Sequence, residues 1–441
     1  MKLFFVILIC KLLKFVGGII GKGSSLPGQI ALKLYPNILS KIKLPKFIIA
    51  VTGSNGKTST VEMIAKILQS NGKSVAYNKE GSNQIEGVTT LVLSNCTLGG
   101  KMNSDILLIE SDERYARYTF KYFHPTHYVI TNLYRDQLTR NGHPQWVYEA
   151  LSHSIHDDTQ LILNADDPLV SCFGAGRENT LFFGVDKLKS SLTYNDGVYN
   201  DGIYCPVCGG RMTYDYYHYN HIGSYCCNTC GFKKADTSFT VTDADMDKGE
   251  ITINGKFNIP LAFTGMYNVY NILAAFAACS VAGVDGKAIA SSIGNYMLKN
   301  GRIMQFRLGS HDGTLLTSKH ENSVSYDQSL KYIASRKEAC SVIVIVDAIS
   351  RKYFTGETSW LWDINFDHLN SKNVRNIYLT GTYVNDLALR FSFADIDQGK
   401  IKPIADIQQC IDYIKENGDE KLYCVTCFSD KEKLLSRVEV L

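Results

Sequence analysis

A glycine-rich turn between a short apolar run and a helical pattern is the feature that most constrains this chain. Residues 47–51 form a β-rich apolar run, and residues 52–60 then read T-G-S-N-G-K-T-S-T before apolar residues recur with helical spacing. Glycines let backbone amides curve around a phosphate, and the start of a helix adds partial positive charge. The pattern therefore predicts a strand, a phosphate-binding loop and a helix within an α/β domain with a parallel sheet.

Individual residues of this loop have predictable roles. We expect Lys57 to bridge the terminal phosphates of ATP and the hydroxyl of Thr58 to hold Mg²⁺. The predicted nucleotide-binding residues of the loop are Gly53, Ser54, Asn55, Gly56, Lys57, Thr58 and Ser59. The full G-x-x-x-x-G-K-T pattern is not met, because Val51 stands where its first glycine would be. A plain tight turn before a helix is the structural alternative.

Acidic residues follow the apolar runs downstream of the loop. Residues 105–110 read as a strand that ends in Glu110, and the strands predicted at 128–132 and 161–163 also lead into polar turns. The carboxyl ends of parallel strands meet at one edge of a sheet, where an acid can contact a metal-bound phosphate. We therefore expect Glu110 to be the Mg²⁺ partner. A single acid at such a position can instead cap a turn or a helix.

Two C-x-x-C pairs interrupt the α/β pattern. They are separated by 18 residues, each is followed by glycine, and they comprise Cys205, Cys208, Cys227 and Cys230. Four thiolates at this spacing predict a closed, structural Zn²⁺ site in a zinc ribbon at about residues 203–233. Cys226 could replace Cys227 as a ligand, and a redox dithiol is the alternative function. The aromatic stretch 214–221 either packs this small ribbon or faces a substrate.

Composition limits the classes of function. The 441 residues, 45% of them apolar and 20% charged, are enough for two or three domains with cores. A formal net charge of +3 is too small to indicate a nucleic-acid partner. Most of the cysteines outside the paired units are scattered through apolar stretches, and we interpret the pair Cys424 and Cys427 as buried thiols. This usage favours a reducing compartment, the cytoplasm.

The amino terminus carries an apolar run at residues 4–10. Seven residues are too few to span a bilayer. Residues 16–18 resemble a signal-peptide cleavage site, but the cysteine usage and the nucleotide motif count against export. We expect a first helix packed on the protein body. The alternative is an amphipathic helix whose lysines contact anionic headgroups at the cytoplasmic face of the membrane.

A second set of polar residues follows the ribbon. Gly265 precedes a small-residue helix in which Asn268 and Asn271 share one face, where their amides could read a purine edge. Asn268 could instead be a helix cap. The segment 300–302, N-G-R, reads as a hinge from which Arg302 can reach a phosphate. Asn268, Asn271 and Arg302 therefore join the predicted nucleotide-binding residues.

These motifs together resemble the Mur ligases. The ribbon inserted in the central domain, with L-P-G-Q at 26–29 and S-W-L-W-D at 359–363, makes the chain similar to the MurT family among them. The resemblance implies an N-terminal helical segment at 1–45 and a Mur ligase ATP-binding domain at 46–302. A smaller Rossmann-like domain is expected at 303–441, with strands at 341–346 and 376–381.

The resemblance also implies a reaction. ATP would phosphorylate the α-carboxylate of D-glutamate in the stem peptide of lipid II, and ammonia would displace the phosphate to leave isoglutamine. Lys57 and Glu110 would then be catalytic. No cysteine here has a nucleophile-elbow context, so ammonia would come from a GatD-like glutaminase subunit in a heterodimer. Two alternatives are a ligase that adds an amino acid to another cell-wall precursor and a non-catalytic ATP-binding assembly subunit.

The chain departs from the family pattern in its C-terminal part. Family members carry an aspartate two residues before S-W, implied as the third member of the partner's Cys-His pair, whereas this chain has Glu357. Its extra methylene moves the carboxylate by about 1 Å, and Asp347 and Asp363 are rivals for the role. Residues 349–351 replace an N-D-N stretch. Residues 318–323 keep the implied catalytic Lys319 but lack the proline and glycine of the family's loop.

Overall fold

The computed structural model describes residues 1–19, 23–78, 82–261, 265–294, 303–319, 321–348, 356–418 and 421–441. They divide into two compact units. Unit 1 comprises residues 1–134, 143–195 and 201–297, and unit 2 comprises residues 135–142, 196–200 and 298–441. The N-terminal segment thus belongs to the same unit as the predicted phosphate loop. The predicted domain boundaries near residues 46 and 302 stay predictions.

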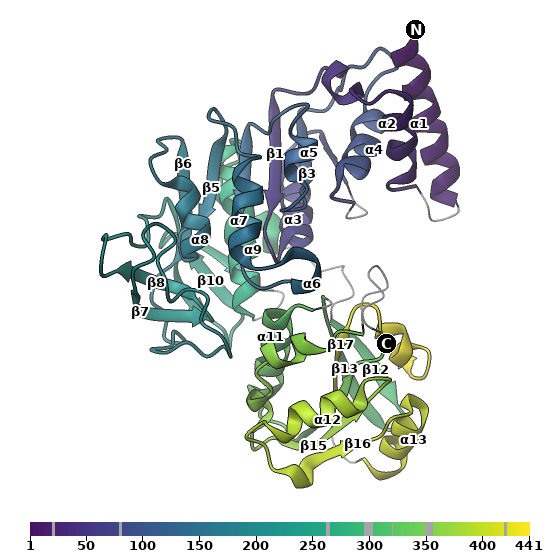
Figure 1. Cartoon of the computed structure of the whole chain (residues 1–441), viewed down its shortest axis with the longest axis vertical. Helices are drawn as coiled ribbons and strands as arrows, with labels where there is room; N and C mark the ends of the chain where they lie inside the picture. The colour runs from purple at the N-terminus through teal and green to yellow at the C-terminus, as the bar shows by residue number, and fades with distance from the viewer. Residues whose placement is uncertain are drawn as a thin grey trace. The chain divides into compact units, whose positions relative to one another are not determined.

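Unit 1 is built on a sheet that, in the described part of the chain, has nine strands in the order β11-β10-β9-β6-β5-β4-β1-β3-β2 (Figure 1). The strands from β2 to β9 in this order pair in parallel, and β9, β10 and β11 pair antiparallel. The strands are β1 (Phe47–Thr52), β2 (Val75–Tyr77), β3 (Ile106–Glu110), β4 (His127–Ile130), β5 (Gln160–Asn164), β6 (Thr180–Val185), β9 (Phe239–Asp245), β10 (Glu250–Ile253) and β11 (Phe257–Pro260). The strands predicted before and after the loop are therefore confirmed.

Helices cover both faces of this sheet, which is why its central strands are apolar throughout. Ile48 and Ala50 of β1 belong to a core that also contains Val147 and Leu151, on the face of α7. On the other face α3 and α9 pack against each other, and α9 also contacts β5, β6 and β9. The helices of unit 1 are α1 (Lys2–Ile19), α2 (Leu26–Leu34), α3 (Lys57–Ser70), α4 (Ile85–Asn95), α5 (Ala116–Thr119), α7 (Pro144–Ser152), α8 (Pro168–Ser171), α9 (Met266–Val281) and α10 (Gly286–Gly294).

Helices α1, α2 and α4 pack on one another (Figure 1). Val6, Ile7 and Cys10 of α1 are buried in the same core as the central strands. The expected first helix packed on the body is therefore present. None of the helices within the described residues has the length and apolar character that crossing a membrane requires.

The predicted ribbon contains the hairpin of β7 (Met212–Tyr219) and β8 (Ile222–Cys227), which pair antiparallel. Its aromatic side chains pack against the main sheet region of unit 1. The hydroxyl of Tyr225 donates to the carbonyl of Ala165 at 3.0 Å, and the hydroxyl of Tyr216 donates to the carbonyl of Val185 at 3.2 Å. Of the two roles considered for the aromatic stretch, packing of the ribbon is the one the contacts support.

Unit 2 is a second, smaller α/β body. Its sheet has, among the described residues, seven strands in the order β16-β15-β14-β17-β13-β12-β18, parallel from β16 to β13. The strands are β12 (Ile303–Leu308), β13 (His311–Ser318), β14 (Cys340–Ile345), β15 (Val374–Thr380), β16 (Ile401–Pro403), β17 (Lys421–Cys427) and β18 (Glu439–Val440). The helices are α6 (Leu138–Asn141), α11 (Ser323–Ala334), α12 (Val384–Ser392), α13 (Ile407–Asn417) and α14 (Lys431–Leu435).

Two predictions for this unit are confirmed. The strands expected at 341–346 and 376–381 are β14 and β15. Cys424 and Cys427 are buried in β17, with 0% and 2% of their surface exposed. Burial raises the pKa of both thiols, that of Cys427 to about 12. Both side chains are therefore protonated at neutral pH and serve as core packing.

Candidate active site

The loop between β1 and α3 adopts a conformation that depends on glycine. Gly53 has φ +138° and Gly56 has φ +84°, both in the range that side chains with a Cβ atom avoid. A Cβ atom on Gly53 would overlap Oγ1 of Thr131, and one on Gly56 would overlap Oδ1 of Asn271. The two glycines thus permit both the turn and the close approach of neighbouring elements.

The end of β4 holds this loop in place. The side chain of Asn132 accepts from the backbone N–H of Asn55 at 2.8 Å and donates to the carbonyl of Asn55 at 3.2 Å. Thr131 donates to the same carbonyl at 2.9 Å, and Ser54 donates to the carbonyl of Tyr134 at 2.9 Å. Asn132 was not among the predicted site residues. The signal for it was its place after β4, the neighbour of β1 in the sheet.

Lys57 lies at the start of α3 with only 8% of its surface exposed. Its Nζ atom donates to the carbonyl of Gly53 and lies 3.0 Å from Oε2 of Glu113. The ammonium group is therefore held over the loop by an ion pair. A buried cation at this position can exchange one anionic partner for another, as phosphate binding requires. Glu113 follows the strand that ends in Glu110, where acids near a metal-bound phosphate are expected, but no individual role was predicted for it.

Glu110 ends β3 and is buried, with 3% of its surface exposed. Its Oε1 atom accepts from Asn83 at 3.2 Å, whereas Oε2 has no hydrogen-bond partner among the described residues. Burial raises the pKa of Glu110, against the opposing effects of Lys57 and Thr58. A buried carboxylate oxygen without a partner, next to a threonine hydroxyl and a lysine, fits the oxygen ligands that Mg²⁺ prefers.

Asn268 and Asn271 lie in the first turns of α9, and both are buried. The close approach to Gly56 places the side-chain oxygen of Asn271 against the phosphate loop. Asn271 is thus brought to the loop end of the predicted site, and the purine-reading role of the two asparagines stays a prediction. Arg302 lies outside the described residues.

Lys319 follows the last residue of β13 in unit 2 and lies where the family's loop carries a proline and a glycine that this chain lacks. Its ammonium group pairs with the carboxylate of Asp136, which also accepts from Nδ2 of Asn322 at 2.8 Å. Glu321 adopts φ +53°, and its carbonyl accepts from the backbone N–H of Gln137 at 3.0 Å. Lys319, Glu321 and Asn322 are therefore held by side-chain and backbone bonds to residues 136–137 of the same unit.

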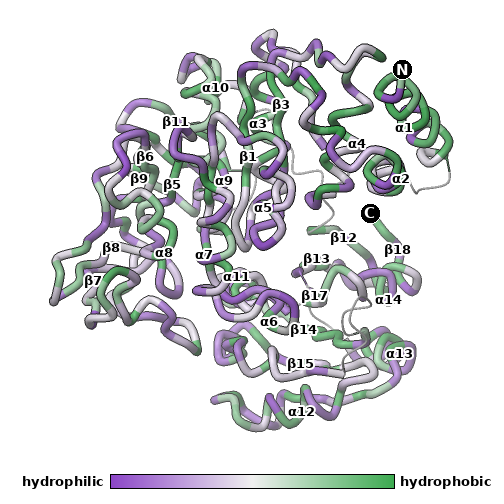
Figure 2. The backbone as a smooth tube through the Cα atoms, turned by 45° about the horizontal axis from the view of Figure 1, so that its top comes forward, coloured by the Kyte–Doolittle hydropathy of each residue, from purple (hydrophilic) through white to green (hydrophobic). Residues whose placement is uncertain are grey.

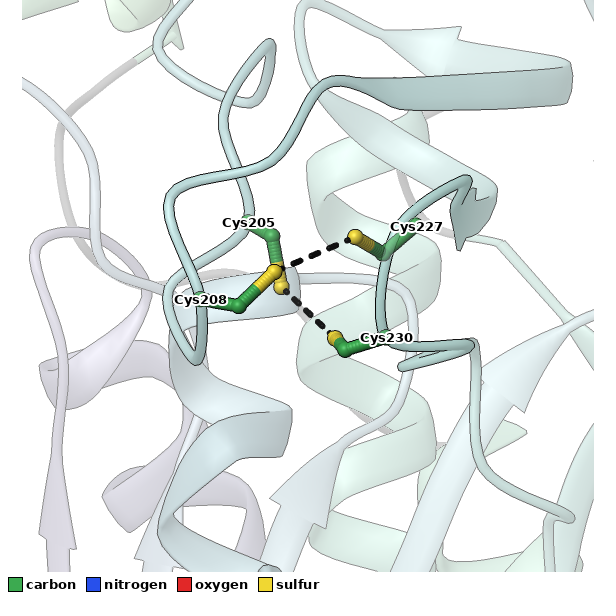
Figure 3. Close-up of side chains that lie close together, drawn as sticks. All are labelled: Cys205, Cys208, Cys227 and Cys230. Atoms are coloured by element: carbon green, nitrogen blue, oxygen red, sulfur yellow. Dashed lines mark hydrogen bonds between the residues drawn. The ribbon is translucent and has the colours of Figure 1, made fainter.

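The four cysteines of the ribbon turn their sulfur atoms toward one another (Figure 3). The Sγ atoms of Cys205 and Cys230 are 3.7 Å apart, and those of Cys208 and Cys227 are 3.5 Å apart. Ligands at about 2.3 Å from a tetrahedral zinc ion would be separated by about 3.8 Å, so the spacing fits a Zn²⁺ site. Cys226 is exposed and is not part of this group.

Backbone amides support the same group. The N–H groups of Val207, Gly210 and Thr229 point to the sulfurs of Cys205, Cys208 and Cys227, each at 3.4 Å. Such bonds stabilise thiolates and orient metal ligands.

Comparison with known families matches both units. Residues 51–203 match the Mur ligase middle domain, and residues 320–430 match the MurT ligase C-terminal domain. The chain is 31% identical to the lipid II isoglutaminyl synthase (glutamine-hydrolyzing) subunit MurT of Staphylococcus aureus, over 88% of this chain and 87% of that protein. It belongs to the MurT family. The corresponding subunit of Streptococcus pneumoniae is 29% identical over 94% of this chain and 92% of its own length.

Solved structures show that the fold extends beyond the MurT family. A pseudomurein peptide ligase type C from Methanothermus fervidus has a TM-score of 0.71 and 20% identity, covering 91% of this chain and 80% of that one. MurF ligase from Thermotoga maritima, in complex with ADP, has a TM-score of 0.58 and 16% identity, covering 93% and 83%. At these identities the likeness concerns the Mur ligase fold alone.

The carboxylates considered for the third catalytic position of the MurT family differ in what holds them. Glu357 is exposed, and its Oε1 atom accepts from the backbone N–H of Ser359 at 2.8 Å; the side chain of Ser359 and this backbone bond lower the pKa of Glu357. Asp347 pairs with Lys433 at 2.9 Å and accepts from Thr382 at 2.8 Å.

Asp363 lies 3.4 Å from Arg135. Among the described residues, Asp347 and Asp363 pair with cations whereas Glu357 accepts from the neutral Ser359, which favours Glu357 as an ionised acceptor for another group. Residues 349–351 lie outside the described residues.

Proposed function

We propose that this chain is the ATP-dependent synthetase subunit that amidates the D-glutamate α-carboxylate in the stem peptide of lipid II. As a member of the MurT family, it is an ATP-dependent ligase that forms carbon–nitrogen bonds. The observation that carries the proposal is the geometry around the phosphate loop. Lys57 contacts the loop and pairs with Glu113, and the Oε2 atom of Glu110 has no hydrogen-bond partner among the described residues.

The residues of unit 1 support the first half of this reaction. The amides of residues 53–58 and the ammonium of Lys57 would hold the β- and γ-phosphates, while Thr58 and Glu110 would bind Mg²⁺. Mg²⁺ neutralises charge on the transferred phosphoryl group. The carboxylate oxygen of the substrate would attack the γ-phosphorus and give an acyl phosphate and ADP. When ATP binds, Lys57 would turn from Glu113 to the phosphates, because both are anions that can accept from its Nζ atom.

The second half needs ammonia. Ammonia would attack the acyl carbon, expel inorganic phosphate and leave the amide of isoglutamine. We propose a GatD-like glutaminase as its source, with Glu357 orienting the glutaminase's histidine in a heterodimer. We also propose Lys319, held by Asp136, as a catalytic cation, which the resemblance to the MurT family implies.

We further propose a structural Zn²⁺ in the ribbon, held by Cys205, Cys208, Cys227 and Cys230. A cytoplasmic location follows from this metal site and from the use of ATP, because both thiolate ligands and nucleotide are maintained there.

The test measures amide formation by the zinc-loaded chain with lipid II, Mg-ATP and ammonium. We expect amidation with ammonium alone, and glutamine-driven amidation only when a glutaminase subunit is present. Lys57→Ala should lower turnover about 100-fold or more, since it removes a charge that is used in the transition state.

Lys73→Ala is the matched control, because Lys73 is exposed after the end of α3. Amide formation that requires an amino acid instead of ammonia would contradict the proposal. It would indicate a ligase that adds an amino acid to another cell-wall precursor. Turnover that is unchanged in Lys57→Ala would remove the phosphate loop from the mechanism.

A further inference from the structure

Helix α1 exposes an apolar stripe on the side that faces away from the core. The exposed apolar side chains in residues 1–19 are Met1, Phe4, Phe5, Ile9, Leu12, Phe15, Val16 and Ile19. Phe15 is 74% exposed and Ile19 is 76% exposed. Figure 2 colours α1 largely as hydrophobic along its length. A contiguous apolar surface of this kind is unusual on a solvent-exposed face and marks an interaction site.

The stripe has the geometry of a helix that lies in an interface. At about 100° per residue, these side chains occupy an arc of about 140°, opposite the arc that buries Val6, Ile7 and Cys10. Lys2, which is exposed, falls at one edge of the exposed arc on the same helical projection, and Lys11, which donates to the carbonyl of Ser94 at 2.8 Å, falls at the other. Lysines beside an apolar stripe can reach headgroups while the stripe enters the acyl boundary.

Charge distinguishes this part of the chain from the rest. Residues 1–46 contain eight lysines and no acidic residue, which leaves 38 basic against 43 acidic residues in the remainder. Lys2, Lys33, Lys41 and Lys43 are exposed. The amino-terminal segment is therefore strongly basic on a chain that is otherwise slightly acidic. An anionic surface is its electrostatic complement, because lysines near such a surface are attracted to it.

We infer that α1 docks unit 1 onto an anionic phospholipid bilayer, with the stripe in the acyl boundary and the lysines at the headgroups. The helix does not have to span the membrane for this, which agrees with the absence of a spanning helix among the described residues. A second copy of the chain is a poorer occupant, because two such basic segments would repel each other.

The placement is useful for a lipid-linked substrate, a point that rests on the proposed function. A cavity of about 310 Å³ lies beside α1 and is lined by Lys14 of that helix and by polar groups that include Ser24, Ser82 and Thr90. Lys14 lies on the buried side of α1, so a docked α1 would keep unit 1 and this cavity at the membrane surface with the cavity behind the helix. The docking itself is independent of the reaction.

The experiment uses the zinc-loaded full chain and phosphatidylcholine vesicles with or without phosphatidylglycerol, read by co-sedimentation. We expect binding to the vesicles that contain phosphatidylglycerol, and weaker binding as salt rises. The double variant Phe5→Glu/Phe15→Glu should bind about ten-fold more weakly or worse, because it places charge in the stripe. Both side chains are exposed, so the fold should be retained, which the thermal melt checks.

Trp146→Glu is the matched control, since Trp146 is 65% exposed on α7, outside the amino-terminal helices. The inference fails if the wild-type chain ignores anionic vesicles or if the double variant binds them like the wild type. It also fails if the two substitutions disrupt a dimer of the chain or a complex with a glutaminase partner that the wild type forms, because another protein then covers the stripe. Ammonia-driven amidation of a soluble lipid II analogue, measured without vesicles, tests the proposed function separately.

Discussion

Glu357 differs by one methylene group from the aspartate that the family carries, so substitutions at this position test the effect of that difference. Its carboxylate is exposed, ionised and fixed by the N–H of Ser359. With a glutaminase partner present, Glu357→Gln should lower glutamine-driven amidation roughly 100-fold or more, because an amide orients an imidazole poorly. Ammonium-driven amidation by the same variant should stay unchanged.

Glu357→Asp is the conservative counterpart, since it restores the residue that the family carries. It should keep glutamine-driven turnover at or above the wild-type level. Equal rates for Glu357→Gln and the wild type with glutamine would show that another carboxylate serves the partner.

Asp327 of α11 gives a pH-dependent prediction for stability. Burial raises its pKa from 3.8 to about 7, although Oδ1 accepts from the N–H of Asn365 at 2.8 Å. Between these values the folded state binds more protons than the unfolded state, so the contribution of Asp327 to stability falls as pH rises and levels off above about pH 7. Asp327→Asn, which mimics the protonated acid, should remove this loss.

The measurement is the free energy of unfolding of both proteins by urea at about pH 5 and about pH 8. Burial lowers the pKa of His368 to about 4, so the contribution of this neutral, buried histidine to the stability of the protein rises with pH. The difference between the two proteins, and not the wild-type curve, therefore isolates Asp327. A stability difference that does not change with pH would contradict the assignment.

Two neighbouring cysteines on one strand of the ribbon hairpin allow a test of which one binds zinc. Cys227 of β8 lies in the four-sulfur group, whereas Cys226 beside it is exposed and outside the group. Cys227→Ser should lose zinc and lower the melting temperature, since binding energy at such a site contributes directly to folding. Cys226→Ser should keep about one zinc ion per chain, by elemental analysis. Zinc retained in Cys227→Ser and lost in Cys226→Ser would reverse the ligand assignment.

The whole chain should report nucleotide binding as stability. A ligand that binds only the folded state stabilises it by about 2.7 kcal/mol at a concentration 100 times its dissociation constant. Mg-ATP should therefore raise the temperature of the unfolding transition, measured by calorimetry, in the wild type and much less in Lys57→Ala. A non-hydrolysable ATP analogue should give the same shift, which separates binding from turnover. No shift at saturating nucleotide would contradict a folded phosphate site.

Local patterns predicted those parts that depend on neighbours in the chain. The strand, loop and helix from Phe47 onward follow from apolar periodicity and glycine spacing, and the hairpin follows from its paired cysteines. Buried thiols at Cys424 and Cys427 follow from the apolar run around them. Each of these depends on short-range propensity or on residue types whose chemistry allows few alternatives.

Contacts distant in sequence were decided by the tertiary structure alone. Glu113 pairs with Lys57 and Asn132 binds Asn55 because β1 lies between β3 and β4, an order that no local pattern contains. The choice of Cys227 over Cys226 depends on which way a strand turns each side chain. The exposed stripe of α1 likewise appears only when its other face is buried, because an apolar helix does not reveal from its composition which side the core will cover.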